Sequence, residues 1–207
     1  MSIIHVIFAP RATFERIRER GGGFVIPLLV LIAVCVITFM FNIPFLEKTA
    51  EQTAAERNLD VDMLRTTMIV SGAITAPVIA SAMIFIVGLL LLLVNLIVRG
   101  DAKYFSLVKV ALLSTVPGWI SSLLTGVLAR MSDVDDLTQV SFSLGAFMTQ
   151  KEGFLYGIAQ LTNPFSIWQM VLLVIGTSVM ANKPSAAVGW WIIIGWVAIQ
   201  SLVSLFL

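Results

Sequence analysis

The sequence predicts an all-α, polytopic membrane protein with five transmembrane helices and an amphipathic N-terminal helix at the membrane interface. Of its 207 residues, 58% are hydrophobic and only 12% are charged, whereas soluble domains have about 45–50% apolar and about 25% charged residues. Five long apolar stretches alternate with polar segments, and Lys109 is the only charged side chain within them. Because charge is unfavourable in hydrocarbon, this segregation indicates membrane spans.

Residues 1–23 are predicted to form a cytoplasmic amphipathic segment that lies on the membrane surface. The segment begins with several apolar residues, Pro10 breaks this apolar stretch, and Phe14 and Ile17 follow at helical spacing. Four arginines on this segment are candidate contacts for anionic lipid or a protein partner: Arg11, Arg16, Arg18 and Arg20. The alternative is that the segment is an orientation signal that packs as a short stub.

The apolar stretches predict one membrane domain over residues 24–207. About 20 helical residues cross a bilayer core of ~30 Å, and all five stretches qualify. The second is long enough that we expect a tilted or Pro77-kinked helix whose first turns project beyond the bilayer. The spans are 24–46, 68–98, 105–129, 164–180 and 186–207.

The distribution of Lys and Arg predicts the orientation. The N-terminal segment and the short loops 99–104 and 181–185 carry seven of these residues. The long loops 47–67 and 130–163 carry five, together with nine acidic residues. Cytoplasmic loops are enriched in Lys and Arg, so we expect a cytoplasmic N-terminus and a C-terminus on the opposite side.

The two long loops differ in character. Residues 47–67 are rich in Ala, Glu and Gln, so we expect them to extend the neighbouring helices, with Asp60 or Asp62 as a helix cap. The 130–163 loop contains many apolar residues, which predicts a short interfacial helix near 152–161.

Small residues recur every fourth position in two of the spans. Such faces let helix backbones approach closely in lipid. We expect them to pack against other helices of the same chain, with a dimer interface as the alternative. The candidate helix-packing faces are Gly72, Ala76 and Ala80 in the second span, and Gly118, Ser122 and Gly126 in the third.

Lys109 and Asn95 are the candidate intramembrane polar residues. Lys109 lies about one turn inside the third span, so its ammonium group is expected to extend to the cytoplasmic interface. The alternative is a role in a polar cavity. Asn95 is expected to form a hydrogen bond between helices rather than to bind substrate.

The sequence offers no pattern typical of catalysis or cofactor binding. His5 is the single histidine and Cys35 the single cysteine, so neither a histidine-based triad nor a thiolate metal cluster can be assembled. The spans hold no carboxylate, and Asp133, Asp135 and Asp136 lack the glycine and distal glutamate of a calcium loop. A net charge of +1 excludes a globally basic nucleic-acid binder. We therefore predict no enzyme activity, no metal and no cofactor.

Three segments resemble the Yip1 family of five-span membrane proteins. They are IFAPRATFERI (7–17), GDAKYFSLVKVALLSTVPGWI (100–120) and NPFSIWQMVLLVIG (163–176), followed by a tryptophan-rich last span. The matching positions are structural hallmarks: Pro10, Phe14, Gly100, Pro117, Phe165 and Trp168. The chain lacks the long N-terminal region and the Asp-Leu-Tyr-Gly-Pro motif of eukaryotic members, which act with Rab-type GTPases. The resemblance therefore implies a short prokaryotic member located in the inner (plasma) membrane.

These observations favour a non-enzymatic membrane scaffold or adaptor. It would act through helix-face packing and its basic N-terminal helix, in contact with the bilayer and with a protein partner or a second copy. The alternative is a small transporter or channel with a cavity among the helices near Lys109, Pro77 and Pro117.

Overall fold

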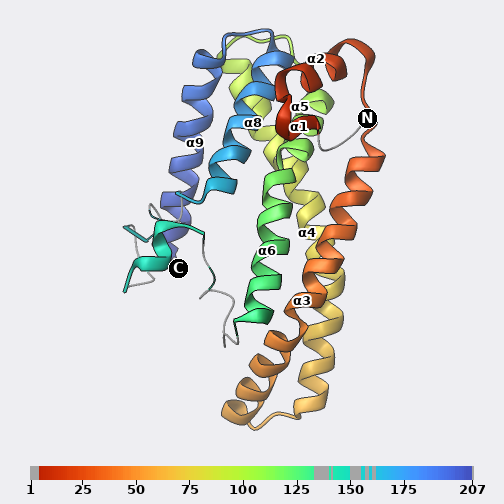
Figure 1. Ribbon diagram of the computed structural model, residues 1–207, viewed down its shortest axis with the longest axis vertical. Helices are drawn as coiled ribbons and strands as arrows, with labels where there is room; N and C mark the ends of the chain where they lie inside the picture. The colour runs from red at the N-terminus through yellow and green to blue at the C-terminus, as the bar shows by residue number, and fades with distance from the viewer. Residues whose placement is uncertain are drawn as a thin grey trace.

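The computed structural model describes residues 5–132, 140, 142–149, 155, 156, 159 and 162–206, with side chains described as far as residue 199. Its regular secondary structure in these residues is entirely helical, as the composition predicts. The helices, shown in Figure 1, are α1 (His5–Phe8), α2 (Pro10–Arg20), α3 (Val25–Arg57), α4 (Val61–Ile97), α5 (Tyr104–Ser114), α6 (Val116–Met131), the 3₁₀ helix η2 (Leu144–Phe147), α8 (Pro164–Ala181) and α9 (Ser185–Phe206).

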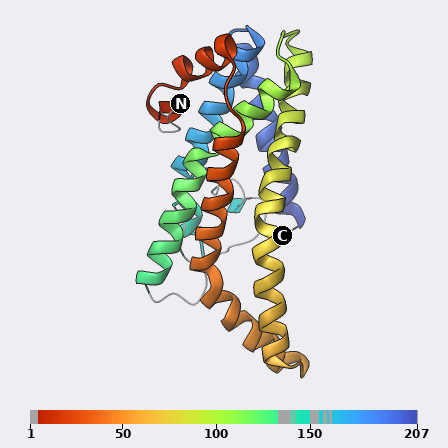
Figure 2. The same ribbon diagram turned by 90° about the vertical axis from the view of Figure 1, so that its right-hand side faces the viewer.

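Helices α3 and α4 form an antiparallel hairpin that extends beyond the other helices (Figures 1 and 2). They have 33 and 37 residues, so at about 1.5 Å per residue both are longer than the hydrocarbon core. The Asp60 side chain accepts a 2.7 Å hydrogen bond from the backbone N–H of Met63 and is therefore the N-cap of α4. An ion pair between Arg65 and Glu47 joins the two helices farther along the hairpin.

The third predicted span is divided into α5 and α6 at Thr115. Pro117 lies in the first turn of α6, where its missing N–H leaves no intrahelical hydrogen bond broken. The Thr115 hydroxyl donates a 2.6 Å hydrogen bond to the carbonyl oxygen of Leu112. Pro77 has no comparable effect, because α4 is assigned as one unbroken helix on both sides of it.

The N-terminal helices and the two short interhelical turns lie together at one end of the bundle (Figures 1 and 2). The backbone N–H of Asp101, in the α4–α5 turn, donates a 3.2 Å hydrogen bond to the carbonyl oxygen of Ala181, at the end of α8. The tip of the α3–α4 hairpin lies at the opposite end. The three segments that carry the excess of Lys and Arg therefore share one side.

Helix α5 lies at the centre of the hydrophobic core. Seven of its eleven residues are buried, mainly between α4 and α8. In contrast, α3 and α4 each bury only four residues and leave many apolar side chains exposed, which is expected of surfaces that face lipid rather than water. The largest side chains of the core with under 2% exposure include Phe14, Leu107, Leu112 and Leu172.

Four helices in the described part of the chain are long and apolar enough to cross a membrane. These are Val25–Arg57, Val61–Ile97, Tyr104–Met131 and Pro164–Ala181. The fifth predicted span coincides with α9, of which Ser185–Ile199 is described as a shorter apolar helix. The chain is thus a polytopic helical membrane protein, and five crossings remain the prediction.

The described part of the 130–163 loop is short. It contains η2, and the backbone N–H of Leu144 donates a 2.8 Å hydrogen bond to the Thr162 hydroxyl. The Asn163 side chain caps α8 by accepting a 2.9 Å hydrogen bond from the N–H of Phe165. The helix predicted near 152–161 and the Asp133, Asp135 and Asp136 cluster lie outside the described residues, apart from 155, 156 and 159.

Candidate functional site

The amphipathic helix α2 is fastened to the membrane bundle by its apolar face. Phe14 is fully buried and Ile17 is 5% exposed, and the face that carries them packs against α8. Within α2, the Thr13 hydroxyl donates a 2.9 Å hydrogen bond to the carbonyl oxygen of Ala9. Phe14 and Ile17 are therefore covered by protein rather than by lipid, whereas Phe8, ahead of α2, is 83% exposed.

A glycine on α8 creates the space for this contact. A Cβ atom added at Gly176 would lie 2.9 Å from Cζ of Phe14 and 2.6 Å from Cγ1 of Val110. Both distances are too short for carbon atoms in van der Waals contact, which lie about 3.5–4.0 Å apart. Gly176 therefore lets the Phe14 ring pack closely between α8 and α5.

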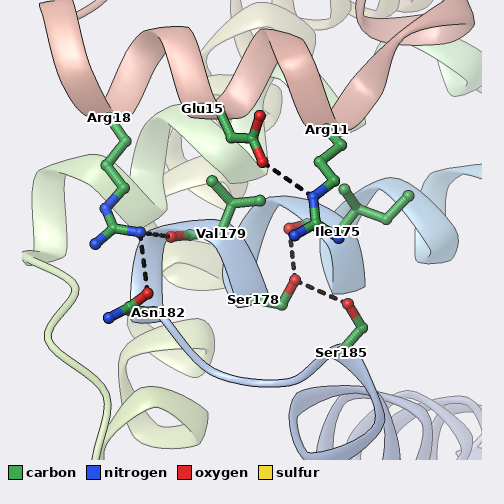
Figure 3. Close-up of polar contacts among 8 residues, drawn as sticks. All are labelled: Arg11, Glu15, Arg18, Ile175, Ser178, Val179, Asn182 and Ser185. Carbon is green, nitrogen blue, oxygen red and sulfur yellow. Dashed lines mark hydrogen bonds and ion pairs between the residues drawn. The ribbon is translucent and has the colours of Figure 1, made fainter.

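Arg18 joins α2 to the last turn of α8 (Figure 3). One Nη atom of its guanidinium donates hydrogen bonds to the carbonyl oxygen of Val179 at 3.0 Å and to Oδ1 of Asn182 at 3.4 Å. The last carbonyl groups of a helix lack intrahelical partners and carry partial negative charge. Arg18 thus serves as a C-terminal cap supplied by a helix far away in the sequence.

The other three arginines of α2 remain on its exposed surface. Arg11 forms an ion pair with Glu15, in which Nε and Oε1 are 2.9 Å apart, and its side chain is 76% exposed. Arg16 and Arg20 are also exposed. The four arginines predicted as one set therefore have two different environments, since only Arg18 is used to attach the helix.

Asn95 is buried at the end of α4 and organises the α4–α5 turn. Its side chain accepts a 3.2 Å hydrogen bond from the N–H of Ala102 and donates one of 3.3 Å to the carbonyl oxygen of the same residue. A Cβ atom at Gly100 would collide with Oδ1 of Asn95 and lie 2.7 Å from Cβ of Ala181. The partner of Asn95 is thus a turn rather than another helix.

Lys109 lies near the point where α3 begins. Its Nζ atom is 5.7 Å from the centroid of the Phe105 ring, which in turn is 5.2 Å from the ring of Phe24. Phe24 directly precedes α3. The half-buried Lys109 side chain therefore lies beside the end of a predicted span, the position at which a lysine reaches the lipid headgroups.

The small residues of the second span lie along α3. A Cβ atom at Gly72 would be 2.7 Å from Cε2 of Phe39, and Ala76 and Ala80 are half-buried. Close approach of α3 and α4 therefore depends on the absence of a side chain at residue 72.

The small residues of the third span are divided between two neighbouring helices. Gly118 lies opposite α8, because its Cβ would be 3.2 Å from Oε1 of Gln169. Gly126 lies against α3, where its Cβ would be 2.9 Å from Cβ of Phe41. Ser122, between them, is exposed.

An apolar groove of about 450 Å³ separates α8 from α9. It begins at the first turn of α9, at Ser185, and extends to Ile193. Across it, α8 contributes residues from Met170 to Ile175. Ser178, just beyond the groove, is within 3.0 Å of Ser185, hydroxyl to hydroxyl (Figure 3). Sequence analysis did not find this groove, because apolar residues that line it do not differ in type from those that face lipid.

Comparison with known proteins agrees with the architecture. The family model of the Yip1 domain matches residues 4–207. The chain is also similar to the membrane protein YknW of Bacillus subtilis (strain 168), with 26% identity over 181 residues, which cover 84% of this chain and 76% of the relative. No solved structure matches the chain significantly. The match over nearly the whole length, together with the helical membrane fold, shows that the chain belongs to the Yip1 family.

Proposed function

We propose that the protein is a non-enzymatic scaffold or adaptor of the inner (plasma) membrane, with α2 as its cytoplasmic contact surface. The observation that supports this proposal is the attachment of α2 to α8 through buried Phe14 and the Arg18 cap. Because α2 is attached through both the Phe14 ring and the Arg18 guanidinium, its orientation relative to the bundle is defined. Its outer surface can therefore present the same side chains to every partner.

The outer surface of α2 is basic and polar. Arg16 and Arg20 are exposed on it, and the only acidic residues of the helix are Glu15 and Glu19. Such a surface suits anionic lipid headgroups or an acidic face of a protein partner. In this proposal the end that carries α2 and the two short turns is cytoplasmic, in agreement with the distribution of Lys and Arg.

Site-specific photo-crosslinking in native membranes tests the adaptor function. A photoreactive amino acid replaces Arg16 or Arg20 on the outer surface of α2, and the matched control carries it at Met63. Met63 is 74% exposed at the start of α4, near the hairpin tip at the opposite end of the bundle. We expect a discrete protein adduct, either with a partner or with a second copy, from the α2 positions and not from residue 63.

Charge reversal adds a second measurement. Arg16→Glu with Arg20→Glu changes the outer surface without touching Phe14 or Arg18, so the variant should remain folded and lose the adduct. If the α2 positions give neither a partner adduct nor a self-adduct in membranes that contain the wild-type protein, the adaptor proposal is wrong.

The two cavities found among the described residues do not support the transporter alternative. The cavities described are the α8–α9 groove and a smaller one of about 160 Å³ beside Gln169 and Trp196. Neither is lined by Lys109, Pro77 or Pro117, the residues from which that alternative was argued.

A further inference from the structure

The groove between α8 and α9 has the form of a binding site for one lipid chain. Its volume of about 450 Å³ falls within the range of about 300–1,000 Å³ that is typical of ligand pockets. Its lining is apolar except for Ser185. From residue 185 to residue 193 of α9 it extends about 12 Å along the helix axis, at about 1.5 Å per residue.

The groove opens toward the surface that faces lipid. Trp190, on its rim, is 68% exposed, and Ile193 is 40% exposed. Because α8 is long and apolar enough to cross the membrane, acyl chains rather than water surround this opening. An apolar groove in contact with hydrocarbon is filled most readily by a chain from the bilayer itself.

Polar groups lie at one end of the groove only. Ser185 lines the end nearest α2, and Figure 3 shows Arg11 extending from α2 toward α8. Nε of Arg11 donates to Glu15. In the described part of the chain its two Nη atoms have no protein acceptor, so both can bind a phosphate group, for which a guanidinium is well suited.

We propose that this groove holds one acyl chain of an anionic phospholipid whose phosphate is bound by Arg11, at the end of the groove that Ser185 lines. The inference rests on the membrane location of the bundle and on the position of α2 in the proposed function, but not on the adaptor role. It adds a specific lipid site, distinct from the exposed Arg16 and Arg20 surface assigned to a protein partner.

Two glycines of α9 provide a matched pair of variants. A Cβ at Gly189 would lie 3.4 Å from Cγ1 of Val174, across the groove, so Gly189→Leu places a larger side chain within it. A Cβ at Gly195 has no atom within 4 Å. Gly195→Leu therefore makes the same chemical change on the same helix, outside the groove.

The test uses the full chain in bilayers that contain phosphatidylglycerol or phosphatidylcholine with a photoreactive group on one acyl chain. After irradiation, labelled peptides are mapped by mass spectrometry. We expect wild-type labelling to concentrate on residues 170–175 and 186–193, with more from phosphatidylglycerol than from phosphatidylcholine. Gly189→Leu should lower this labelling about tenfold or more, because the chain loses its apolar contacts, whereas Gly195→Leu should not.

Arg11→Gln should reduce phosphatidylglycerol labelling to the phosphatidylcholine level while labelling of the groove persists. Equal labelling of both lipids in the wild-type protein overturns the phosphate contact. Wild-type labelling spread evenly over the exposed faces of α3 and α4 overturns the site, and this result needs no variant to fold. A dimer that is lost in Gly189→Leu assigns the groove to a second copy instead. Failure of the α2 crosslinking with intact groove labelling contradicts only the adaptor function.

Discussion

The guanidinium of Arg18 on α2 donates a 3.0 Å hydrogen bond to the backbone carbonyl oxygen of Val179, in the last turn of α8. The two residues are 161 positions apart in the sequence. This bond and the buried Phe14 ring attach α2 to α8 at two points, Val179 and Gly176, which lie within one helical turn. Residues 21–23, all glycine, link α2 to α3. The N-terminal segment and the fourth predicted span are therefore joined at the end of the bundle that we propose to be cytoplasmic.

Replacement of Arg18 should weaken the attachment of α2 to α8. Arg18→Ala removes a cation from the negative end of α8 and leaves the carbonyl oxygen of Val179 with only the 3.4 Å bond from the N–H of Asn182, so we expect a loss of about 1 kcal/mol in the free energy of unfolding. Hydrogen exchange at residues 10–20 should become faster. Arg16→Ala, on the exposed surface of the same helix, is the control and should stay within about 0.5 kcal/mol of wild type. Equal effects of the two variants contradict a capping role.

Gly176→Ala should destabilise the protein more than the addition of a single methyl group to a helix suggests. The new methyl group lies 2.6 Å from Cγ1 of Val110 and 2.9 Å from Cζ of Phe14, and such overpacking costs typically about 1–3 kcal/mol. Part of the strain should be relieved by displacement of α2, and the backbone at the exposed Arg16 and Arg20 should then be cleaved faster by trypsin. Gly189→Ala is the matched control, because its nearest contact is 3.4 Å. Trypsin cleavage rates that rise equally in both variants refute this account.

The sequence predicts the elements of this fold better than it predicts their contacts. Hydropathy locates the spans because charge is excluded from hydrocarbon, and the capping rule narrows the start of α4 to Asp60 or Asp62. In contrast, the apolar face of α2 carries the same pattern whether lipid or α8 covers it. The sequence therefore identifies Phe14 as part of the apolar face, but it does not identify Gly176 as the residue against which Phe14 packs.

The contacts of single polar residues were also beyond local patterns. Arg18 does not differ from Arg16 or Arg20 until α8 is placed beside it. Asn95 was predicted to bond between helices, but it bonds to Ala102 in the following turn. The side of a helix on which a neighbour lies is decided by tertiary packing, and a single sequence does not reveal it.

Asn95→Ala should destabilise the α4–α5 turn. It leaves the N–H and carbonyl groups of Ala102 without their side-chain partner in a part-buried site, at a cost of about 1 kcal/mol. Asn42→Ala is the comparison, since the Asn42 side chain bonds only within its own helix, to the carbonyl oxygen of Thr38. We expect a lower unfolding midpoint and faster exchange at residues 99–103 for Asn95→Ala. An equal decrease for Asn42→Ala argues against a special role of the turn.

Thr177→Val should maintain or increase stability. Thr177 is fully buried on α8, and its hydroxyl has no hydrogen-bond partner within the described structure. A valine of nearly the same shape removes the unsatisfied oxygen, and the gain can reach about 1 kcal/mol. Its neighbour supplies the contrast, because the Ser178 hydroxyl donates to the carbonyl oxygen of Ile175 at 2.9 Å. Thermal unfolding in detergent should therefore show Ser178→Ala below wild type and Thr177→Val at or above it.

The α3–α4 hairpin should depend on Asp60 and not on Asp62, although both are acidic residues at the start of the same helix. The Asp60 side chain accepts the hydrogen bond from the N–H of Met63, whereas Asp62 lies within the first turn and contributes only through the helix dipole. Asp60→Ala should cost about 1 kcal/mol, and Asp62→Ala a few tenths. Because the hairpin extends beyond the bundle, the loss should appear as faster hydrogen exchange at residues 58–67, while α5 and α8 keep their protection. Faster exchange throughout the bundle in Asp60→Ala would show instead that the hairpin unfolds together with the membrane core.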